Sequence, residues 1–380
     1  MTGTDGPTPF GVYVHVPFCA SRCGYCAFNT YTGAELASLE RYVDAAIGEL
    51  RLARRTIGDD RRVQTVFFGG GTPTMLAPTE LLRILDVIRS EFGFATDVEI
   101  TVEANPDSID RDGLAALRAG GFTRVSFGMQ SVRTHVLAVL DRTHTPGRAA
   151  HAVADARTGG FEHINLDVIY GTPGESDDDW AATVDAVLAT DVDHVSAYAL
   201  TLEPGTRLTA QVRQGRVAAL DEDALAARYE WLDERLGAAG FEWYELSNWA
   251  RGAAAQCRHN LIYWRGDDWW GIGPGAHSHL AGRRWRNVAH PRDYAARIDQ
   301  GEVPVAEAAE ILEEPARRLE QVMTRIRLAE GCPVSLLDRE GRAAASRAVT
   351  DGLLEPLAVQ RFRLTSHGRQ LADHVLRRIV

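Results

Sequence analysis

Three cysteines lie within eight residues near the start of the chain, in the stretch PFCASRCGYCAF (residues 17–28). Their spacing is Cys-x3-Cys-x2-Cys, and the full set of cysteines in the chain is Cys19, Cys23, Cys26, Cys257 and Cys332. An odd number of thiols disfavours a disulfide framework. Clustered thiolates instead favour a metal centre. This is either a four-iron, four-sulfur cluster held through three of its irons, or a zinc site completed by Cys257 or a histidine.

Short apolar runs alternate with amphipathic stretches over the first half of the chain. The runs that are typical of strands are residues 12–16, 63–68, 98–103, 124–129, 164–169 and 194–200. The stretches with helical periodicity between them are residues 39–54, 80–92, 113–119, 149–158 and 180–189. Six strands that alternate with helices predict an α/β fold with a parallel sheet and right-handed crossovers, as an open twisted sheet or a partial barrel.

Polar and glycine-rich residues follow these strands. The cysteine loop comes after the first strand, and GGGTPT (residues 69–74) comes after the second. Glu103 ends the third strand, Gln130 follows the fourth and Asp167 lies on the fifth. Barrels and doubly wound sheets build their active sites at the carboxyl ends of their strands. The sequence therefore predicts one shared site at this edge of the sheet.

The pattern changes after residue 205. Residues 206–300 are dense in Trp, Tyr, His and Gly, and the remaining residues show a helix, a short pair of strands and a final helix. We therefore predict three parts: a βα-repeat domain over residues 1–205, a connecting region over 206–300, and a smaller C-terminal α+β domain of winged-helix type over 301–380.

Charge and composition exclude several classes of function. The formal net charge is −11, which disfavours a nucleic-acid partner. Every basic side chain other than histidine is Arg, so neither a Schiff-base lysine nor a P-loop lysine exists. No apolar run is long enough to span a membrane, and residues 1–9 lack a signal-peptide pattern. We expect a cytoplasmic protein, in which thiols stay reduced.

The cysteine loop and the glycine motif together resemble the radical S-adenosylmethionine (SAM) superfamily. More specifically, the chain is similar to the branch that contains the oxygen-independent coproporphyrinogen III oxidases and the HemW haem chaperones. The motifs that carry this similarity are, in order, VYVHVPFC, FFGGGTPT, TVEANP, SFGMQS, LDRTHT and NLDVIYGTPGES. The resemblance implies a partial (β/α)6 TIM-like barrel of the radical SAM type, followed by the smaller C-terminal domain.

The resemblance also implies the cofactors and their contacts. Cys19, Cys23 and Cys26 would hold a [4Fe-4S] cluster, and SAM would chelate the open iron, where a reduced cluster could cleave it to a 5′-deoxyadenosyl radical. Glycines without side chains would let the backbone approach the methionine end of SAM. The residues implied to contact SAM are Tyr13, Tyr25, Gly70, Gly71, Thr72, Glu103, Gln130, Arg142 and Asp167.

Two departures separate the chain from the oxidases. Their loop usually carries a fourth cysteine two positions after the third, and here that position is Phe28. Because the first predicted strand begins at Val12, we also expect the N-terminal segment of the oxidases to be missing. Conversely, the chain matches the His-Asn-x-x-Tyr-Trp pattern of the HemW chaperones, and the resemblance implies that His259, Asn260, Tyr263 and Trp264 bind haem.

Two functions remain open from the sequence. One is a haem chaperone that binds haem, with His259 as axial ligand or His277, His279 or Cys257 in its place, and passes the haem to acceptor haemoproteins such as respiratory ones. The other is radical oxidative decarboxylation of coproporphyrinogen III. Phe28 favours the chaperone, and the resemblance adds a homodimer as a candidate assembly.

Overall fold

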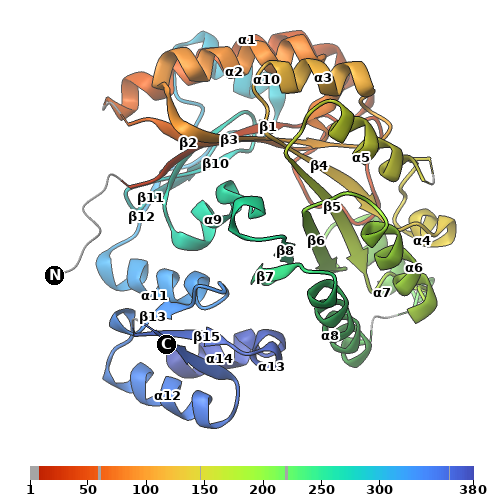
Figure 1. The fold of residues 1–380 in the computed structure, drawn as a ribbon. Coiled ribbons are helices and arrows are strands. Elements are labelled where there is room, and N and C mark those ends of the chain that lie inside the picture. The colour runs from red at the N-terminus through yellow and green to blue at the C-terminus, as the bar shows by residue number, and fades with distance from the viewer. Residues whose placement is uncertain (1–7, 59–60, 146, 219–220, 359) are drawn as a thin grey trace.

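The structure is a computed structural model, and it describes residues 8–58, 61–145, 147–218, 221–358 and 360–380. A twelve-stranded sheet forms its centre, with the strand order β12-β11-β10-β9-β1-β2-β3-β4-β5-β6-β8-β7 (Figure 1). The first six strands along the chain are β1 (Phe10–Val16), β2 (Val63–Gly70), β3 (Phe94–Ala104), β4 (Arg124–Gln130), β5 (His163–Tyr170) and β6 (His194–Ala199). These are the six strands that the apolar runs predict, and they are parallel neighbours in sequence order.

A further strand extends this parallel array beyond β1. Strand β9 (Asp268–Ile272) pairs with β1 in parallel, with Phe10 opposite Asp268 and Val14 opposite Ile272. Among the described residues, seven neighbouring strands are therefore parallel rather than the six predicted. The sequence did not reveal β9 because its partner lies more than 250 residues away along the chain, where no local periodicity connects the two segments.

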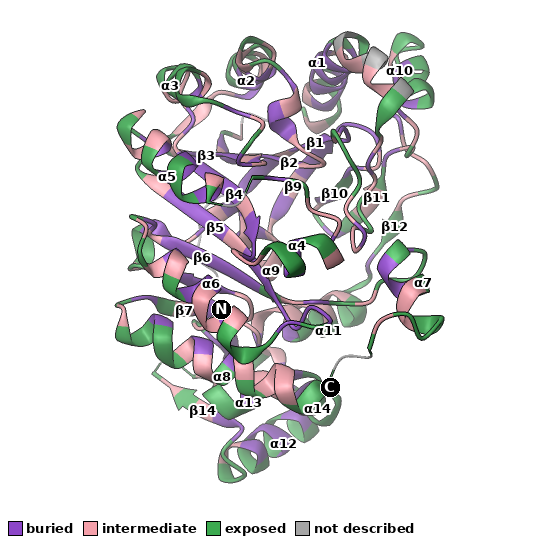
Figure 2. Ribbon diagram, turned by 90° about the vertical axis from the view of Figure 1, so that its right-hand side faces the viewer, coloured by how far each residue is buried: buried purple, intermediate pink, exposed green. Residues whose placement is uncertain are grey.

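Helices cover the convex face of the curved sheet (Figure 1). They are α1 (Leu39–Ile57), α2 (Pro78–Phe92), α3 (Arg111–Ala119), α5 (Arg148–Thr158), α6 (Asp177–Leu188), α8 (Glu222–Ala238) and α10 (Pro291–Asp299). Each helix covers the sheet because one of its faces is apolar. In α2, Leu81, Ile84, Leu85 and Ile88 repeat at helical spacing, are buried and belong to the main apolar core. Figure 2 shows the sheet almost wholly buried beneath helices whose outer faces are exposed.

The segment after β6 adds to both ends of this sheet. Strands β7 (Glu242–Glu245) and β8 (Asn248–Ala250) extend it next to β6, while β10 (His277–Leu280), β11 (Arg283–Arg286) and β12 (Glu310–Ile311) extend it beyond β9. Helix α9 (Arg258–Arg265) instead lies on the concave face, inside the curve of the sheet (Figure 1). Strands on both sides of residue 205 thus share one sheet, and the three-part domain division stays a prediction.

The C-terminal residues form a small unit with its own apolar core. Its elements are α11 (Glu314–Arg325), β13 (Cys332–Pro333), α12 (Arg339–Thr350), β14 (Leu354–Leu357), β15 (Arg361–Leu364), α13 (Ser366–Gln370) and α14 (Ala372–Ile379). The three strands form an antiparallel sheet in the order β13-β15-β14, and residues such as Leu354, Val375 and Leu376 pack against it. The winged-helix assignment stays a prediction.

Short elements complete the described chain. They are the helices α4 (Thr134–Val139) and α7 (Arg207–Arg213) and the 3-10 turns η1 (Gly33–Ser38), η2 (Pro73–Met75), η3 (Ala253–Ala255) and η4 (Val334–Leu336). Within the described ranges, no helix is both long enough and apolar enough to cross a membrane.

Candidate functional site

A cavity of 550 Å3 opens where the parallel strands end. Its wall contains all three clustered cysteines and eight of the nine residues predicted to contact SAM: Tyr25, Gly70, Gly71, Thr72, Glu103, Gln130, Arg142 and Asp167. The cysteine loop follows β1, the glycines end β2, and the other side chains come from or follow β3, β4 and β5. The topology therefore brings together residues that are spread over about 150 positions of sequence, as expected for the carboxyl edge of a parallel sheet. We call this space the first cavity.

The cysteine loop is fixed to its surroundings through the backbone. Cys19 donates its N–H to the carbonyl of Tyr31 at 3.0 Å, and Gly24 donates to the carbonyl of Leu140 at 3.0 Å. The three thiols are partly buried, and burial is the main cause that raises the pKa of Cys19 and of Cys26. The loop therefore holds three sulfurs in one partly exposed segment.

Two donors reach these sulfurs from other parts of the chain, Thr72 after β2 and Arg142 after α4. Arg142 Nη1 lies 3.5 Å from Cys23 Sγ, and the hydroxyl of Thr72 lies 3.7 Å from Cys19 Sγ. A guanidinium and a hydroxyl next to thiols favour the thiolate, which is the form that binds iron or zinc. Cys257 lies elsewhere, buried with its sulfur 3.7 Å from Glu99 Oε1, so it does not complete a zinc site at the loop in this conformation.

The glycine motif fits closely against the cysteine loop. A Cβ added at Gly71 would lie 2.6 Å from the carbonyl oxygen of Phe18 and 3.0 Å from Cys19 Sγ. The Gly71 N–H donates to the carbonyl oxygen of Val16, and the Thr72 N–H donates to the carbonyl oxygen of Phe18, each at 2.8 Å. Only glycine fits at position 71 without moving the loop.

Two carboxylates, Glu103 and Asp167, line the inner wall of the first cavity. Glu103 Oε2 accepts the N–H of Gly70 at 3.2 Å, and Asp167 accepts from Ser126 Oγ at 2.9 Å and from Asn165 Nδ2 at 2.7 Å. Burial, followed by the charge of Asp167, raises the pKa of Glu103 to about 8. Burial also raises the pKa of Asp167. These oxygens can accept from an ammonium or from ribose hydroxyls.

Strand β4 is distorted where it meets the first cavity. Its pairing with β5 shifts between Gly128 and Gln130, and Gln130 has a φ of 63°, in the left-handed region. Arg142 Nη2 donates to the carbonyl of Gly128 at 2.7 Å, and a Cβ at Gly128 would lie 3.0 Å from that nitrogen. Backbone strain of this kind is common at ligand sites. The sequence predictions did not include Gly128, Ser126 or Asn165, although all three lie within the motifs SFGMQS and NLDVIYGTPGES.

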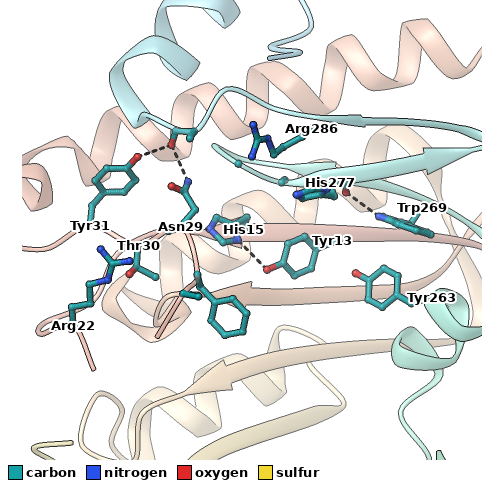
Figure 3. A pocket seen from close by; sticks show the side chains of 15 residues that line it. Tyr13, His15, Arg22, Asn29, Thr30, Tyr31, Tyr263, Trp269, His277 and Arg286 are labelled. Atoms are coloured by element: carbon teal, nitrogen blue, oxygen red, sulfur yellow. Dashed lines mark hydrogen bonds between the residues drawn. The ribbon is translucent and has the colours of Figure 1, made fainter. Parts of the chain in front are cut away.

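A second cavity, of 620 Å3, lies beside the first, where β9 and β10 extend the sheet (Figure 3). Its wall includes Tyr13, His15, Arg22, Phe28, Asn29, Tyr31, Tyr263, Trp269, His277 and Arg286. Tyr13 thus lines this space rather than the first cavity, and its hydroxyl lies 3.0 Å from His15 Nδ1. Arg22 and Phe28 line both cavities, so the end of the cysteine loop forms their common wall.

The His-Asn-x-x-Tyr-Trp residues divide over two faces of α9. His259 and Tyr263 face the sheet: the imidazole is buried, with Nδ1 2.7 Å from Thr65 Oγ1 and Nε2 2.8 Å from Tyr263 Oη. Burial lowers the pKa of His259 to about 3. Tyr263 also lines the second cavity, whereas His259 does not.

The other two residues of the motif point away from both cavities. Asn260 Nδ2 donates to Glu245 Oε1 at 2.8 Å, and Trp264 packs into an apolar cluster that includes Leu261 and Leu328. The structure therefore brings only Tyr263 of the four predicted haem residues to a cavity wall. It does not place the four around one common space.

The two alternative histidine ligands also differ. His279 is buried, and its Nδ1 lies 2.8 Å from the carbonyl oxygen of Asp267. His277, two residues earlier on β10, is exposed and lines the second cavity. Burial and the nearby Arg286 lower the pKa of His277, which favours its neutral form.

Comparison with known proteins agrees with this geometry. The family model described as "Radical SAM superfamily" matches residues 13–187. "Heme chaperone HemW" of Mycobacterium tuberculosis (strain ATCC 25618 / H37Rv) is 51% identical over 374 residues, which cover 98% of this chain and 95% of that protein. "Heme chaperone HemW" of Escherichia coli (strain K12) is 32% identical over 381 residues, covering 97% of each chain.

A solved structure shares the fold over nearly the whole chain. It is described as "Coproporphyrinogen III oxidase (HemN) from Escherichia coli is a Radical SAM enzyme", and it matches with a TM-score of 0.83 at 24% identity. The match covers 98% of this chain and 90% of that one. At this identity the match supports the fold and leaves the activity open.

Proposed function

The chain belongs to the HemW family of the radical SAM superfamily, and from this premise we propose that it is a haem chaperone, which binds haem and transfers it to acceptor haemoproteins. The observation that carries the proposal is the 51% identity to a protein named as a haem chaperone over 98% of this chain. Phe28, at the position where the oxidases usually have a fourth cysteine, favours the same function.

The first cavity fits a [4Fe-4S] cluster and SAM. Three thiols face it from one loop, next to the cation of Arg142, and Gly71 leaves open the space that a Cβ would fill. We propose that Cys19, Cys23 and Cys26 hold three irons. A bound cluster, when reduced, supplies the electron that cleaves SAM.

The protein's own residues would bind and orient SAM. Arg142 presents a guanidinium suited to the SAM carboxylate, and Glu103 and Asp167 offer acceptors for its ammonium and ribose hydroxyls. Tyr25, beside Arg142 and Cys23, supplies an aromatic ring for the adenine. Gly70, Gly71 and Thr72 would border the methionine end, and Gln130 would be a further contact from β4.

The haem residues predicted from the sequence stay part of the proposal. Direct coordination by His259 would require its hydrogen bonds to Thr65 and Tyr263 to break, because these bonds occupy both ring nitrogens. Without such a rearrangement, His259 would act through Tyr263, whose ring reaches the second cavity.

The alternative function is that of an oxygen-independent coproporphyrinogen III oxidase. The observation that favours it is the complete wall of the first cavity, since a carrier that never used SAM would not need these polar groups. In that function the cavity residues would hold SAM, and the 5′-deoxyadenosyl radical formed from it would attack the propionate side chains of coproporphyrinogen III.

Haem transfer tests the chaperone proposal. We expect protein loaded with one equivalent of haem to convert an apo-haemoprotein to its holo form faster than free haem does when both are at the same concentration. A bovine serum albumin–haem complex serves as a control for non-specific release. Failure to bind haem near one equivalent, or transfer no faster than from albumin, would refute the proposal.

A further inference from the structure

The second cavity contains chemistry that the SAM site does not use. It is lined from the sheet by Tyr13 and His15 of β1, His277 of β10 and Arg286 of β11, and from the cysteine loop by Arg22 and Phe28 (Figure 3). Its volume of 620 Å3 lies within the range of cavities that hold cofactors, about 300–1,000 Å3. The cavity can therefore hold a sizeable ligand next to, and separate from, SAM.

His277 is the histidine in this cavity whose ring remains available. Its backbone is fixed, because its carbonyl accepts the indole N–H of Trp269 at 2.9 Å, but its ring nitrogens have no hydrogen-bond partner among the described residues. His15, by contrast, uses Nδ1 with Tyr13 and Nε2 with the carbonyl of Asn29. An imidazole with an unoccupied nitrogen on a cavity wall is suited to bind a metal.

Two arginines, Arg22 and Arg286, also lie on this wall, and both are exposed. Their interactions within the protein are long: Arg22 Nη2 lies 3.5 Å from the carbonyl of Cys26, and Arg286 Nη2 lies 3.5 Å from Glu307 Oε1. Guanidinium groups without a close partner can form bidentate pairs with carboxylates. Two such groups match a ligand that carries two carboxylates.

Aromatic rings supply the remaining surface. Trp269 and Tyr263 lie 4.7 Å apart between ring centroids on the cavity wall, and Phe28, on the same wall, exposes 67% of its surface. When a flat hydrophobic ligand covers an exposed apolar ring, the burial of both surfaces stabilises the complex. A metal ligand, two cations and aromatic rings together fit an iron porphyrin with two propionates.

Resting on the proposed function, we propose that haem binds in the second cavity, with His277 as an axial ligand of the iron and with Arg22 and Arg286 paired to the propionates. The haem would then contact Phe28, which lies two residues after the last cluster ligand and also lines the first cavity. His259 then has a positioning role, because its hydrogen bond to the Tyr263 hydroxyl fixes the position of the Tyr263 ring on the cavity wall.

The test is a titration with ferric haem, followed by absorbance and electron paramagnetic resonance, on the full chain and its variants. We expect His277→Ala to weaken haem binding about tenfold or more and to lose the spectral signature of histidine ligation, which added imidazole should restore. His259→Ala should keep that signature. His151→Ala, at an exposed position on α5, is the matched control and should behave like the unmodified protein.

The arginines have their own test. Arg22→Ala and Arg286→Ala should weaken haem binding severalfold, yet leave the affinity for haem dimethyl ester, whose propionates are blocked, unchanged. If His277→Ala keeps the histidine signature while His259→Ala loses it, the assignment to the second cavity is overturned although the chaperone function stands. If the unmodified protein binds no haem, the proposed function itself fails.

Discussion

His259 Nε2 lies 2.8 Å from Tyr263 Oη, one helical turn away on α9, and of the two side chains only the tyrosine reaches a cavity. The histidine is further held by Thr65 and by stacking on Phe67, with ring centroids 5.2 Å apart. The imidazole of the His-Asn-x-x-Tyr-Trp motif is therefore buried among side chains of the sheet and of α9, and does not line either cavity.

The first prediction concerns this histidine. His259→Ala removes a buried ring and both of its hydrogen bonds, so we expect the free energy of unfolding to fall by about 2–4 kcal/mol. Haem affinity should weaken because Tyr263 loses its support, while SAM affinity stays unchanged. Thermal unfolding and separate haem and SAM titrations measure these effects. Unchanged stability together with a complete loss of haem binding would instead indicate a direct ligand.

The second prediction concerns the cluster ligands. Cys23→Ala should abolish the visible absorbance and lower the iron content after anaerobic reconstitution, because the loop loses one of its three sulfurs. Cys332→Ala is the control, since Cys332 is buried in the C-terminal core and lines neither cavity. If both variants keep a normal cluster, the ligand assignment is wrong.

The third prediction concerns the close contact at Gly71. In Gly71→Ala the added Cβ would overlap with the Phe18 carbonyl and press on Cys19 Sγ, so the cysteine loop must move. We expect SAM affinity to fall about tenfold or more, measured by calorimetry on reconstituted protein.

A second glycine supplies the comparison. Gly237 lies inside helix α8, and a Cβ there would meet nothing within 4 Å. Gly237→Ala should leave SAM affinity unchanged and raise stability by up to about 1 kcal/mol, the difference in helix propensity. Equal SAM affinities for the two variants would contradict the role given to Gly71.

The fourth prediction concerns pH. Glu103 has a pKa of about 8, so it is mostly protonated at pH 7 and becomes charged as the pH rises. If it accepts from the ammonium or ribose hydroxyls of SAM, affinity should increase from about pH 7 to about pH 9. The groups near this carboxyl are Asp167, the hydroxyls of Tyr13, Tyr198 and Tyr263, and the N–H of Gly70.

Glu103→Gln isolates this carboxyl from its neighbours. The variant keeps the shape of the side chain but cannot ionise, so its SAM affinity should be lower at pH 9 and nearly flat with pH. Calorimetry at several pH values, in buffers of matched ionic strength, measures the profile. A profile that persists in Glu103→Gln would show that a group other than Glu103 causes it, such as the amino group of SAM, which itself titrates near pH 8.

The first cavity could be predicted from sequence to a large extent. The cysteine loop, the glycine motif, Glu103 and Gln130 lie at or after the carboxyl ends of strands whose period is visible locally. Parallel strands bring these ends to one edge whatever the loops between them. Gly71 and Glu103 were found by this argument and by family resemblance together. Tyr13, which the resemblance puts beside SAM, lines the second cavity, and the alternation along β1 does not reveal which neighbouring space a side chain faces.

The second cavity could not be predicted in this way. It joins residues 13–31 to residues 263–289 through the pairing of β1 with β9, and no local pattern connects Arg22 with His277. Helix α9 gave a recognisable motif, but its sequence does not show that His259 faces inward while Asn260 and Trp264 face Glu245 and Leu328.

The most direct test of the chaperone account is one experiment on anaerobically reconstituted protein. SAM, a strong reductant and coproporphyrinogen III are added to one portion, and the products are separated by chromatography, while a second portion is titrated with haem. We predict no protoporphyrinogen and haem binding near one equivalent. Formation of protoporphyrinogen over many turnovers, without stoichiometric haem binding, would contradict the account and make the protein an oxidase.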